Sequence, residues 1–298
     1  MLGVFGLLVG SFLNVVIYRW PVKAEREWWG DMAEHLDDAP MWQRVLGVAR
    51  PPAYDKVGVD IDAALTRLGP LTLSRPRSRC GACGHQIRWY ENIPLLSWLA
   101  LRGRCSACKA PISVRYPLVE LATGLLFAGA AWHFGPHLPT LAWCGVMAAL
   151  VAMAMIDQDT GYLPDFLTQP MLWAGLIAAT LGWTIPWQTA LWGAVAGYMS
   201  LWLLSNGYHL LRGVPGMGNG DFKLLAGLCA WLGWQALLPI VLMASVVGVA
   251  INVPLMLMRK KDAGIKIPFG PFLIGGGLVV VFVGADTVLS WVGVSFPG

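Results

Sequence analysis

The chain has 298 residues, of which 56% are hydrophobic and only 13% are charged, and its mean hydropathy is +0.59. A soluble domain carries about 25% charged residues, so this composition excludes a water-soluble globular enzyme and indicates a polytopic membrane protein. The formal net charge of +4 says little by itself, because the basic residues are distributed unevenly along the chain.

Eight apolar segments are long enough, or nearly so, to cross a bilayer, which takes about 20 helical residues. They cover residues 1–18, 117–134, 138–156, 166–184, 188–210, 222–234, 236–258 and 269–293. The sixth is short, so seven spans are an alternative. The first lacks a preceding basic region and a cleavage site of small residues, so we interpret it as a retained helix. The sequence thus predicts an all-α polytopic membrane protein with about eight transmembrane helices.

The basic residues predict the orientation. Fifteen of the 21 Lys and Arg lie between Arg19 and Arg115, and the other six lie in or beside two short connections, 211–223 and 259–268. With eight spans, all of them fall on one side, which the positive-inside rule makes the cytoplasmic side. The N-terminus is then outside.

Three regions follow from this topology. A first transmembrane helix covers 1–19, a cytoplasmic loop domain covers 20–116, and a transmembrane core covers 117–298. Within the loop, 25–50 is compatible with one or two short amphipathic helices on the membrane surface or with an exposed linker. The sequence shows no internal repeat.

Four of the six cysteines form two C-x-x-C pairs separated by 21 residues: Cys80, Cys83, Cys105 and Cys108. Such pairs supply four thiolates for tetrahedral Zn²⁺. Two disulfides are the alternative, but the cytoplasm keeps thiols reduced. Because cysteine fills all four positions, we predict a structural zinc site with no open position for a catalytic water.

A glycine-rich run ends in a carboxylate, Asp221, at a predicted membrane boundary, where 216–221 has the sequence GMGNGD. A carboxylate at the edge of the hydrocarbon is costly and suggests a function. Gly218 and Gly220 are expected to turn the backbone and to let a substrate backbone approach. Two carboxylates that meet in a dry site can share a proton and activate water, as in aspartic proteases.

The partner of Asp221 has three candidates at the end of the third apolar segment. Asp157 is favoured, because a carboxylate at a helix C-terminus opposes the helix dipole and so has no evident structural role. Asp159 would point to a different face of a continuing helix. Asp165 follows a Leu-Pro pair and is suited to cap the next helix.

Other polar or reactive residues in the apolar segments have simpler interpretations. We expect Asp286 to make a packed polar contact and Lys223 to be an interfacial charge. Cys144 and Cys229 are expected to be buried apolar residues.

The chain resembles the type IV prepilin peptidases, the bifunctional leader peptidases and N-methyltransferases of type IV pilus and type II secretion systems. The resemblance covers nearly the whole chain. The stretches that carry it include GSFLNVVIYR at 10–19, NIP at 92–94, CSACKAPISVRYPLVE at 105–120, LPD at 163–165, GNGD at 218–221 and IPFGP at 267–271. The four-cysteine loop makes the match specific, since the GxGD turn is shared with presenilin-like proteases.

The resemblance implies a function and its residues. Asp157 and Asp221 would be the catalytic pair that removes the basic leader of a prepilin or pseudopilin after a Gly. The new N-terminus would then be methylated with S-adenosylmethionine. The family often has Gly-Lys before the third cysteine; here Gly103 and Arg104 stand there, and Arg differs from Lys in geometry.

The implied partners are prepilin or pseudopilin substrates and membrane lipid in a bacterial inner membrane. No nucleic-acid partner is predicted, and the sequence assigns no oligomeric state. Two other classes of protein remain compatible with the residues alone. One is a transporter that uses the same aspartates as a proton relay, and the other is an assembly factor that docks a partner through the four-cysteine loop.

Overall fold

The computed structural model describes residues 1–214, 216–259, 268–291 and 293. Within these residues there is no strand, only two isolated β-bridges, so the all-α prediction is confirmed. The chain divides into two compact units. The loop unit is Ser11–Leu118, and the bundle unit is Met1–Gly10 together with Val119–Gly298.

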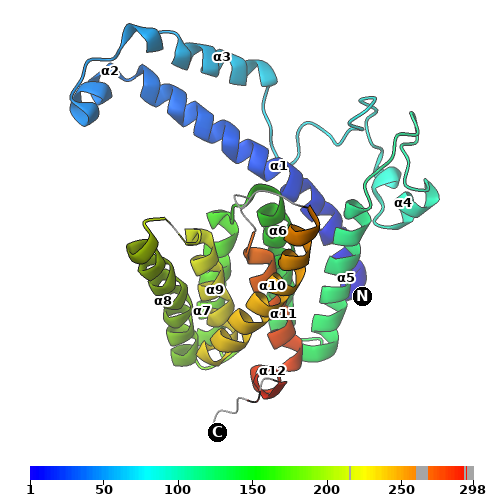
Figure 1. The fold of residues 1–298 in the computed structure, drawn as a ribbon. Helices are drawn as coiled ribbons and strands as arrows, with labels where there is room; N and C mark the ends of the chain where they lie inside the picture. Colours follow the sequence, from blue (N-terminus) through cyan, green and yellow to red (C-terminus); the bar gives the residue numbers. More distant parts are fainter. Residues whose placement is uncertain (215, 260–267, 292, 294–298) are drawn as a thin grey trace. The chain divides into compact units, whose positions relative to one another are not determined.

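From residue 115 onward, most of the described residues are helical (Figure 1). In chain order, the described helices are α1 (Leu2–Asp37), α2 (Ala39–Met41), η1 (Trp42–Leu46), η2 (Pro52–Tyr54), α3 (Val57–Leu68), η3 (Trp89–Asn92), α4 (Leu96–Ala100), α5 (Arg115–Phe134), α6 (Leu138–Thr160), α7 (Asp165–Thr180), α8 (Trp187–Arg212), α9 (Asn219–Leu232), η4 (Trp234–Ala236), α10 (Leu237–Arg259), α11 (Gly270–Val283) and α12 (Ala285–Trp291). Each predicted apolar segment therefore contains a helix.

The number of complete spans is a separate question. By length and composition, three of the described helices can cross a membrane, Leu2–Asp37, Leu138–Thr160 and Trp234–Pro254, and a fourth is the bent pair α11 and α12 if it counts as one span. With 14 residues, α9 is about 21 Å long at 1.5 Å per residue, which is less than the bilayer core of about 30 Å. Eight spans therefore stay a prediction.

The last apolar segment is broken, which we did not expect. The α11 helix ends at Val283, and α12 continues at an angle of 108° to it. Gly284, between them, has φ +92°, a conformation that side chains disfavour. Asp286 lies exposed in the first turn of α12 rather than in the packed contact that we predicted. Residues 260–267 and 292, with Lys260, Lys261 and Lys266 of the orientation argument and the first residue of IPFGP, lie outside the described residues.

The loop unit contains a long helix where short ones were expected. The α1 helix continues to Asp37, and α3 follows a connection held by Arg50, which forms ion pairs with Asp37 and Asp55. The α3 helix packs back onto α1, since Gly58 lies against the Asp37 carboxylate. The Arg19 guanidinium donates to the carbonyls at residues 72 and 73, fastening the following segment to the same helix.

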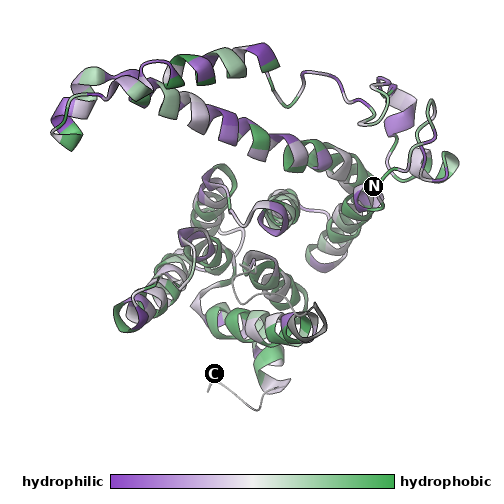
Figure 2. Cartoon of the chain, turned by 45° about the horizontal axis from the view of Figure 1, so that its top comes forward, coloured by the Kyte–Doolittle hydropathy of each residue, from purple (hydrophilic) through white to green (hydrophobic). Residues whose placement is uncertain are grey.

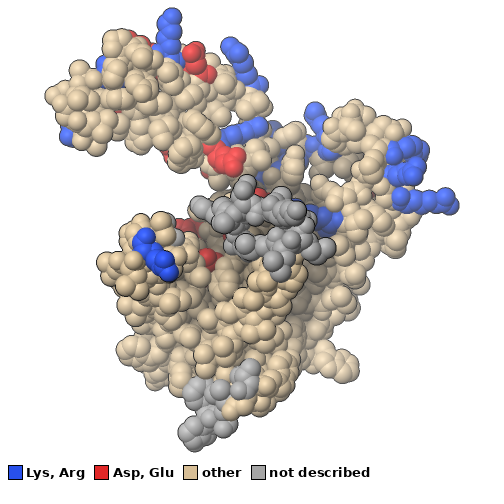
Figure 3. Space-filling model, in the orientation of Figure 1, with Lys and Arg blue, Asp and Glu red and all other residues tan. Residues whose placement is uncertain are grey.

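The bundle unit has an apolar core. The helices are mostly hydrophobic in Figure 2, and in Figure 3 the charged side chains on the visible face of the bundle unit gather at one end. Trp231 of α9 is 2% exposed, and its indole N–H donates to the Met171 carbonyl of α7 at 2.9 Å. On α8, Gly193 and Gly197 lie directly against the α9 backbone. Small residues let helices approach this closely in a membrane.

Gly193→Ala is expected to destabilise the bundle, because the new methyl group would overlap the Cys229 carbonyl. Overpacking of this kind costs about 1–3 kcal/mol. Gly207→Ala on the same helix is the matched control: no described atom outside its own stretch of helix lies within 4 Å of its Cβ position, and alanine favours a helix by up to about 1 kcal/mol. Thermal unfolding in detergent compares the two, and equal midpoints would contradict the close approach of α8 and α9.

Candidate functional site

Asp157 is the buried carboxylate of the site. It lies in the last turns of α6 and is 5% exposed. Its Oδ2 accepts a hydrogen bond of 3.0 Å from the backbone N–H of Gly270, the first residue of α11. A helix N-terminus suits a carboxylate, because its first N–H groups lack partners inside the helix. A Cβ at Gly270 would lie 2.6 Å from the same oxygen, so only glycine leaves this carboxylate in place.

Asp221 lies in the first turn of α9 and is half-buried. It is close enough to Asp157 for the charge on that residue to act on it. The helix begins after Gly218, and among the described residues beyond its chain neighbours the only heavy atom within 4 Å of the Cβ position of Gly218 is Oδ2 of Asp221. No other described residue therefore crowds this position.

Leu163 connects the segments that carry the two aspartates. Its side chain is 4% exposed. Its Cβ lies 2.7 Å from the Cβ position of Gly220, and its Cδ1 lies 3.2 Å from that of Gly270. The end of α6 and the beginnings of α9 and α11 therefore meet around this one leucine, at the same end of the bundle (Figure 1).

The glycines before Asp221 differ from our expectation of a sharp turn. Gly218 has φ −77° and ψ 147°, which is ordinary extended backbone, and Gly220 has no positive φ. Gly220 is instead required by the contact with Leu163, and Gly218 leaves room beside the carboxylate. Close approach to Leu163 explains Gly220, and neither position needs a glycine for a backbone turn.

The other acidic candidates lie outside this arrangement. Asp159 is exposed near the end of α6. Asp165 does not cap α7: the N-cap is Pro164, and no side chain caps that helix. Both Asp165 carboxylate oxygens accept hydrogen bonds from Lys223, at 2.7 and 2.8 Å. This ion pair joins the first turns of α7 and α9, which gives Lys223 a structural partner.

The four cysteines of the loop unit lie together. Their Sγ atoms are all within 4.8 Å of one another, and those of Cys80 and Cys108 are 3.8 Å apart. Tetrahedral zinc with Zn–S bonds of about 2.3 Å places sulfurs roughly 3.8 Å apart, so the cluster fits zinc. All six cysteines are free thiols, which contradicts the disulfide alternative, and Cys144 and Cys229 are buried as predicted.

The backbone around the cluster favours thiolates. The N–H groups of Cys83 and Ala82 lower the pKa of the Cys80 thiol to about 6. Those of Cys108 and Ala107 lower the pKa of the Cys105 thiol in the same way. The thiolate is the form that binds a metal.

The two C-x-x-C turns, called here the first knuckle (80–83) and the second knuckle (105–108), have the same backbone geometry at an offset of 25 residues, a repeat that the sequence did not reveal. In the first knuckle, the Cys80 N–H donates to the His85 carbonyl, and in the second the Cys105 N–H donates to that of Ala110. Each knuckle is closed by one isolated β-bridge. Gly84 and Lys109 occupy the same position, and both have positive φ.

Glu91 links the two knuckles and was missed at the sequence level. Its Oε2 accepts from the Arg88 N–H at 2.8 Å and lies 3.3 Å from His85 Nε2, which in turn contacts the Ser106 hydroxyl. His85 follows the first knuckle, and Ser106 belongs to the second. The available signal was that Glu91 is the only acidic residue between Asp62 and Glu120.

Gly103 and Arg104 lie beside the second knuckle. Gly103 has φ +67°, and a Cβ there would lie 2.8 Å from the ring of Trp98, so its backbone position excludes other residues. Arg104 lines a hollow of about 470 Å³ with Arg102 and Lys109. These two residues therefore have different structural roles: Gly103 shapes the loop, and Arg104 contributes charge to its surface.

A helical membrane bundle with two interacting carboxylates at one end has the parts of a membrane aspartic peptidase. The comparisons with known proteins agree. Residues 4–134 match the bacterial peptidase A24 N-terminal domain, and residues 144–253 match the type IV leader peptidase family. This chain belongs to that family.

Several curated relatives carry the name prepilin leader peptidase/N-methyltransferase. The protein from Stutzerimonas stutzeri is 47% identical, with 97% of this chain and 91% of the relative covered. That from Burkholderia pseudomallei (strain 1026b) is 45% identical, with coverages of 96% and 85%, and that from Aeromonas hydrophila is 45% identical, with 96% and 91%. No solved structure matches this chain.

Purified protein is expected to contain about one zinc per chain, because four thiolates fill a tetrahedral shell. Cys80→Ser and Cys105→Ser should each lose most of that metal. Cys144→Ala is the control, since this cysteine is buried in α6 and is not one of the four cysteines of the cluster, and it should keep the zinc. Metal analysis by mass spectrometry decides, and wild-type protein free of zinc after gentle purification would contradict a structural site.

Proposed function

We propose that this chain removes the leader peptide of type IV prepilins with Asp157 and Asp221 and then methylates the new N-terminus with S-adenosylmethionine. The family and the names of its relatives support both activities. The observation that carries the assignment of residues is the arrangement around Leu163, which brings together the segments of one buried and one half-buried carboxylate.

The contacts of the two carboxylates suggest a different acid–base role for each. Asp157 accepts the N–H of Gly270 at the beginning of α11, and a hydrogen bond to a carboxylate stabilises its ionised form. It acts as the general base that takes a proton from water. Asp221 carries the proton and donates it to the scissile carbonyl oxygen, which withdraws electrons from the carbon that water attacks.

The position of Gly218, uncrowded among the described residues, suits an extended peptide. The apolar helix of the substrate would lie in the bilayer, and its basic leader would stay on the cytoplasmic side. The bond to be cut would then lie at the interface between membrane and water, near the beginning of α9. Gly218, three residues before Asp221, has no side chain of its own that would keep the substrate backbone from the carboxylate.

Two bound groups have residues that fit them. Cys80, Cys83, Cys105 and Cys108 would hold zinc, which fastens the two knuckles together. When bound, S-adenosylmethionine supplies an electrophilic methyl group on a sulfonium. The amine freed by cleavage is the acceptor, and it must lose a proton to solvent before it can attack.

We place the protein in the bacterial inner membrane as a multi-pass protein, in contact with its lipid. The basic loop and both aspartates would face the cytoplasm, and the N-terminus would lie outside. The distribution of Lys and Arg supports this orientation. Pilins and pseudopilins share the leader chemistry, so both substrate types are compatible with the site.

Asp157→Asn and Asp221→Asn are each expected to slow leader cleavage by at least about a hundredfold, because each removes one partner of the acid–base pair. Asp159→Asn is the matched control: it lies exposed on the same helix as Asp157 and should cleave normally. Mass spectrometry of a purified prepilin incubated with enzyme and lipid gives the rates. Full cleavage by either variant would remove that residue from the pair.

Methylation separates the two activities in the same assay. With a prepilin that has already been cut, the Asp221→Asn enzyme should still transfer one methyl group from S-adenosylmethionine. A wild-type enzyme that cleaves but never methylates would show that the protein is a peptidase without methyltransferase activity. An intact substrate with wild-type enzyme would instead favour a proton relay.

Gly270→Ala is expected to reduce cleavage by about ten- to a hundredfold, because its methyl group would displace the Asp157 carboxylate and small displacements of a catalytic group are costly. Gly275→Ala is the control: it lies on the same helix, and no described residue packed against that helix comes within 4 Å of its Cβ position. The two variants are compared by the initial rate of leader removal at equal amounts of folded protein. Equal rates would show that Gly270 does not position Asp157.

A further inference from the structure

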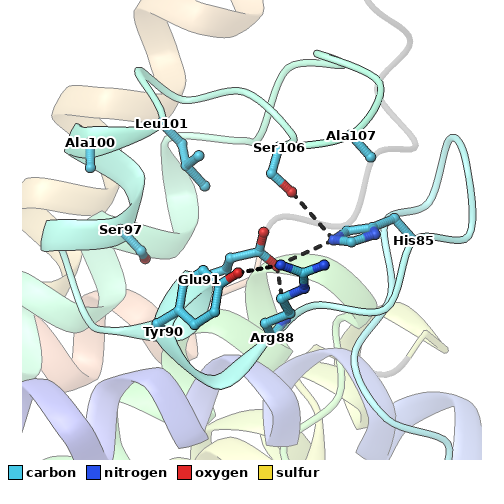
Figure 4. A pocket seen from close by; sticks show the side chains of 9 residues that line it. All are labelled: His85, Arg88, Tyr90, Glu91, Ser97, Ala100, Leu101, Ser106 and Ala107. Atoms are coloured by element: carbon cyan, nitrogen blue, oxygen red, sulfur yellow. Dashed lines mark hydrogen bonds and ion pairs between the residues drawn. The ribbon is translucent and has the colours of Figure 1, made fainter.

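A hollow of about 480 Å³ lies in the loop unit, outside the aspartate site. It is lined by the two knuckles and by the short helices η3 and α4 (Figure 4). Its polar lining consists of His85, Arg88, Tyr90, Glu91, Ser97 and Ser106. This volume falls in the range of small-molecule sites, about 300–1,000 Å³.

Glu91 gives the hollow a fixed negative charge. Its side chain is only 9% exposed, and its hydrogen bonds with the Arg88 N–H and with His85 both use Oε2. The Arg88 N–H, then the Ser106 hydroxyl and His85, hold the pKa of Glu91 at about 2. Figure 4 shows this side chain pointing into the middle of the lining. A carboxylate so held attracts a cation.

Arg88 and Tyr90 provide the complementary groups at the rim. The Arg88 guanidinium donates to the Tyr90 hydroxyl at 2.5 Å and lies 5.9 Å from the centre of the Tyr90 ring. An oriented guanidinium binds a carboxylate through paired hydrogen bonds. A tyrosine ring offers a surface for a flat heterocycle or a cation. On the α4 side, the Ser97 hydroxyl donates to the Ile93 carbonyl, which leaves its oxygen free to accept.

We infer that this hollow binds S-adenosylmethionine, with Glu91 facing the sulfonium and Arg88 facing the carboxylate. The molecule combines a sulfonium, an ammonium, a carboxylate and a flat adenine, and its net charge is one positive. The lining offers a carboxylate for a positive charge, a guanidinium for the carboxylate and an aromatic ring for the adenine. The inference rests on the proposed methyltransferase activity, and it locates the donor in the loop unit, apart from the aspartate pair.

The neighbouring hollow is a poorer candidate for this ligand. It shares Ala100 and Leu101 with the first, but its charged lining consists of Arg102, Arg104 and Lys109. Three cations repel a net positive molecule. Of the two hollows, the one lined by Glu91 is the one that offers a carboxylate to a positive charge.

Calorimetry on the full-length zinc-loaded protein in detergent tests the inference with two probes, S-adenosylmethionine and S-adenosylhomocysteine. The second lacks the sulfonium charge. Glu91→Gln should weaken S-adenosylmethionine binding by about tenfold or more, because a charge-assisted contact is lost, and should change S-adenosylhomocysteine binding by less than about threefold. Glu34→Gln, an exposed carboxylate on α1, is the matched control and should bind both as wild type does.

A second variant covers the case in which Glu91→Gln loosens the knuckles, which zinc analysis of each preparation would reveal. Ala100→Phe fills the hollow from an exposed position without touching the Glu91 hydrogen bonds, and it should weaken both probes by about tenfold or more. Wild-type binding of S-adenosylmethionine by both zinc-loaded variants would overturn this site and leave the proposed function intact. A wild-type protein that neither binds the donor nor transfers a methyl group would overturn both.

Discussion

The hydrogen bond from the Gly270 N–H to the Asp157 carboxylate is the interaction on which the arrangement of the site depends. It brings the end of α6 to the beginning of α11 and satisfies a carboxylate that is almost fully buried. It also fixes the identity of residue 270, because any side chain would occupy the carboxylate position. Leu163 then packs between this contact and the turn that begins α9, so the position of Asp221 follows from that of Asp157. This one contact thus joins two positions that are 113 residues apart in the sequence.

Much of the fold could be predicted from the sequence because it depends on local composition and on short motifs. The apolar segments each contain a helix, and the two C-x-x-C pairs form a cluster that fits zinc. The break at Gly284 could not be foreseen, because a glycine inside an apolar run is compatible with a continuous helix and with a bend. The extension of α1 to Asp37 was missed for a related reason: its polar second half lacks a clear hydrophobic period and is held by Arg19 and Arg50 contacts from outside the helix.

The candidate site also contains residues that could be predicted from the sequence and residues that could not. Asp157 could be preferred over Asp159 from helix geometry, and the structure buries the first and exposes the second. Gly270 and Glu91 were not identified as functional candidates, since each matters through partners that are distant in sequence or hidden in backbone geometry. The repeat of the two knuckles is also carried by backbone hydrogen bonds, which dissimilar side chains such as Gly84 and Lys109 can both support.

The shortness of α7 and α9 has a consequence for how water, the second substrate of any hydrolysis, enters. These neighbours have 16 and 14 residues, or about 24 and 21 Å of helix, and an undisturbed hydrocarbon core is about 30 Å thick. A bilayer that meets helices this short thins around them or lets headgroups and water descend beside them. Asp221, at one end of α9, is then wetted from the membrane surface, and peptide hydrolysis at this depth requires no tunnel through the protein.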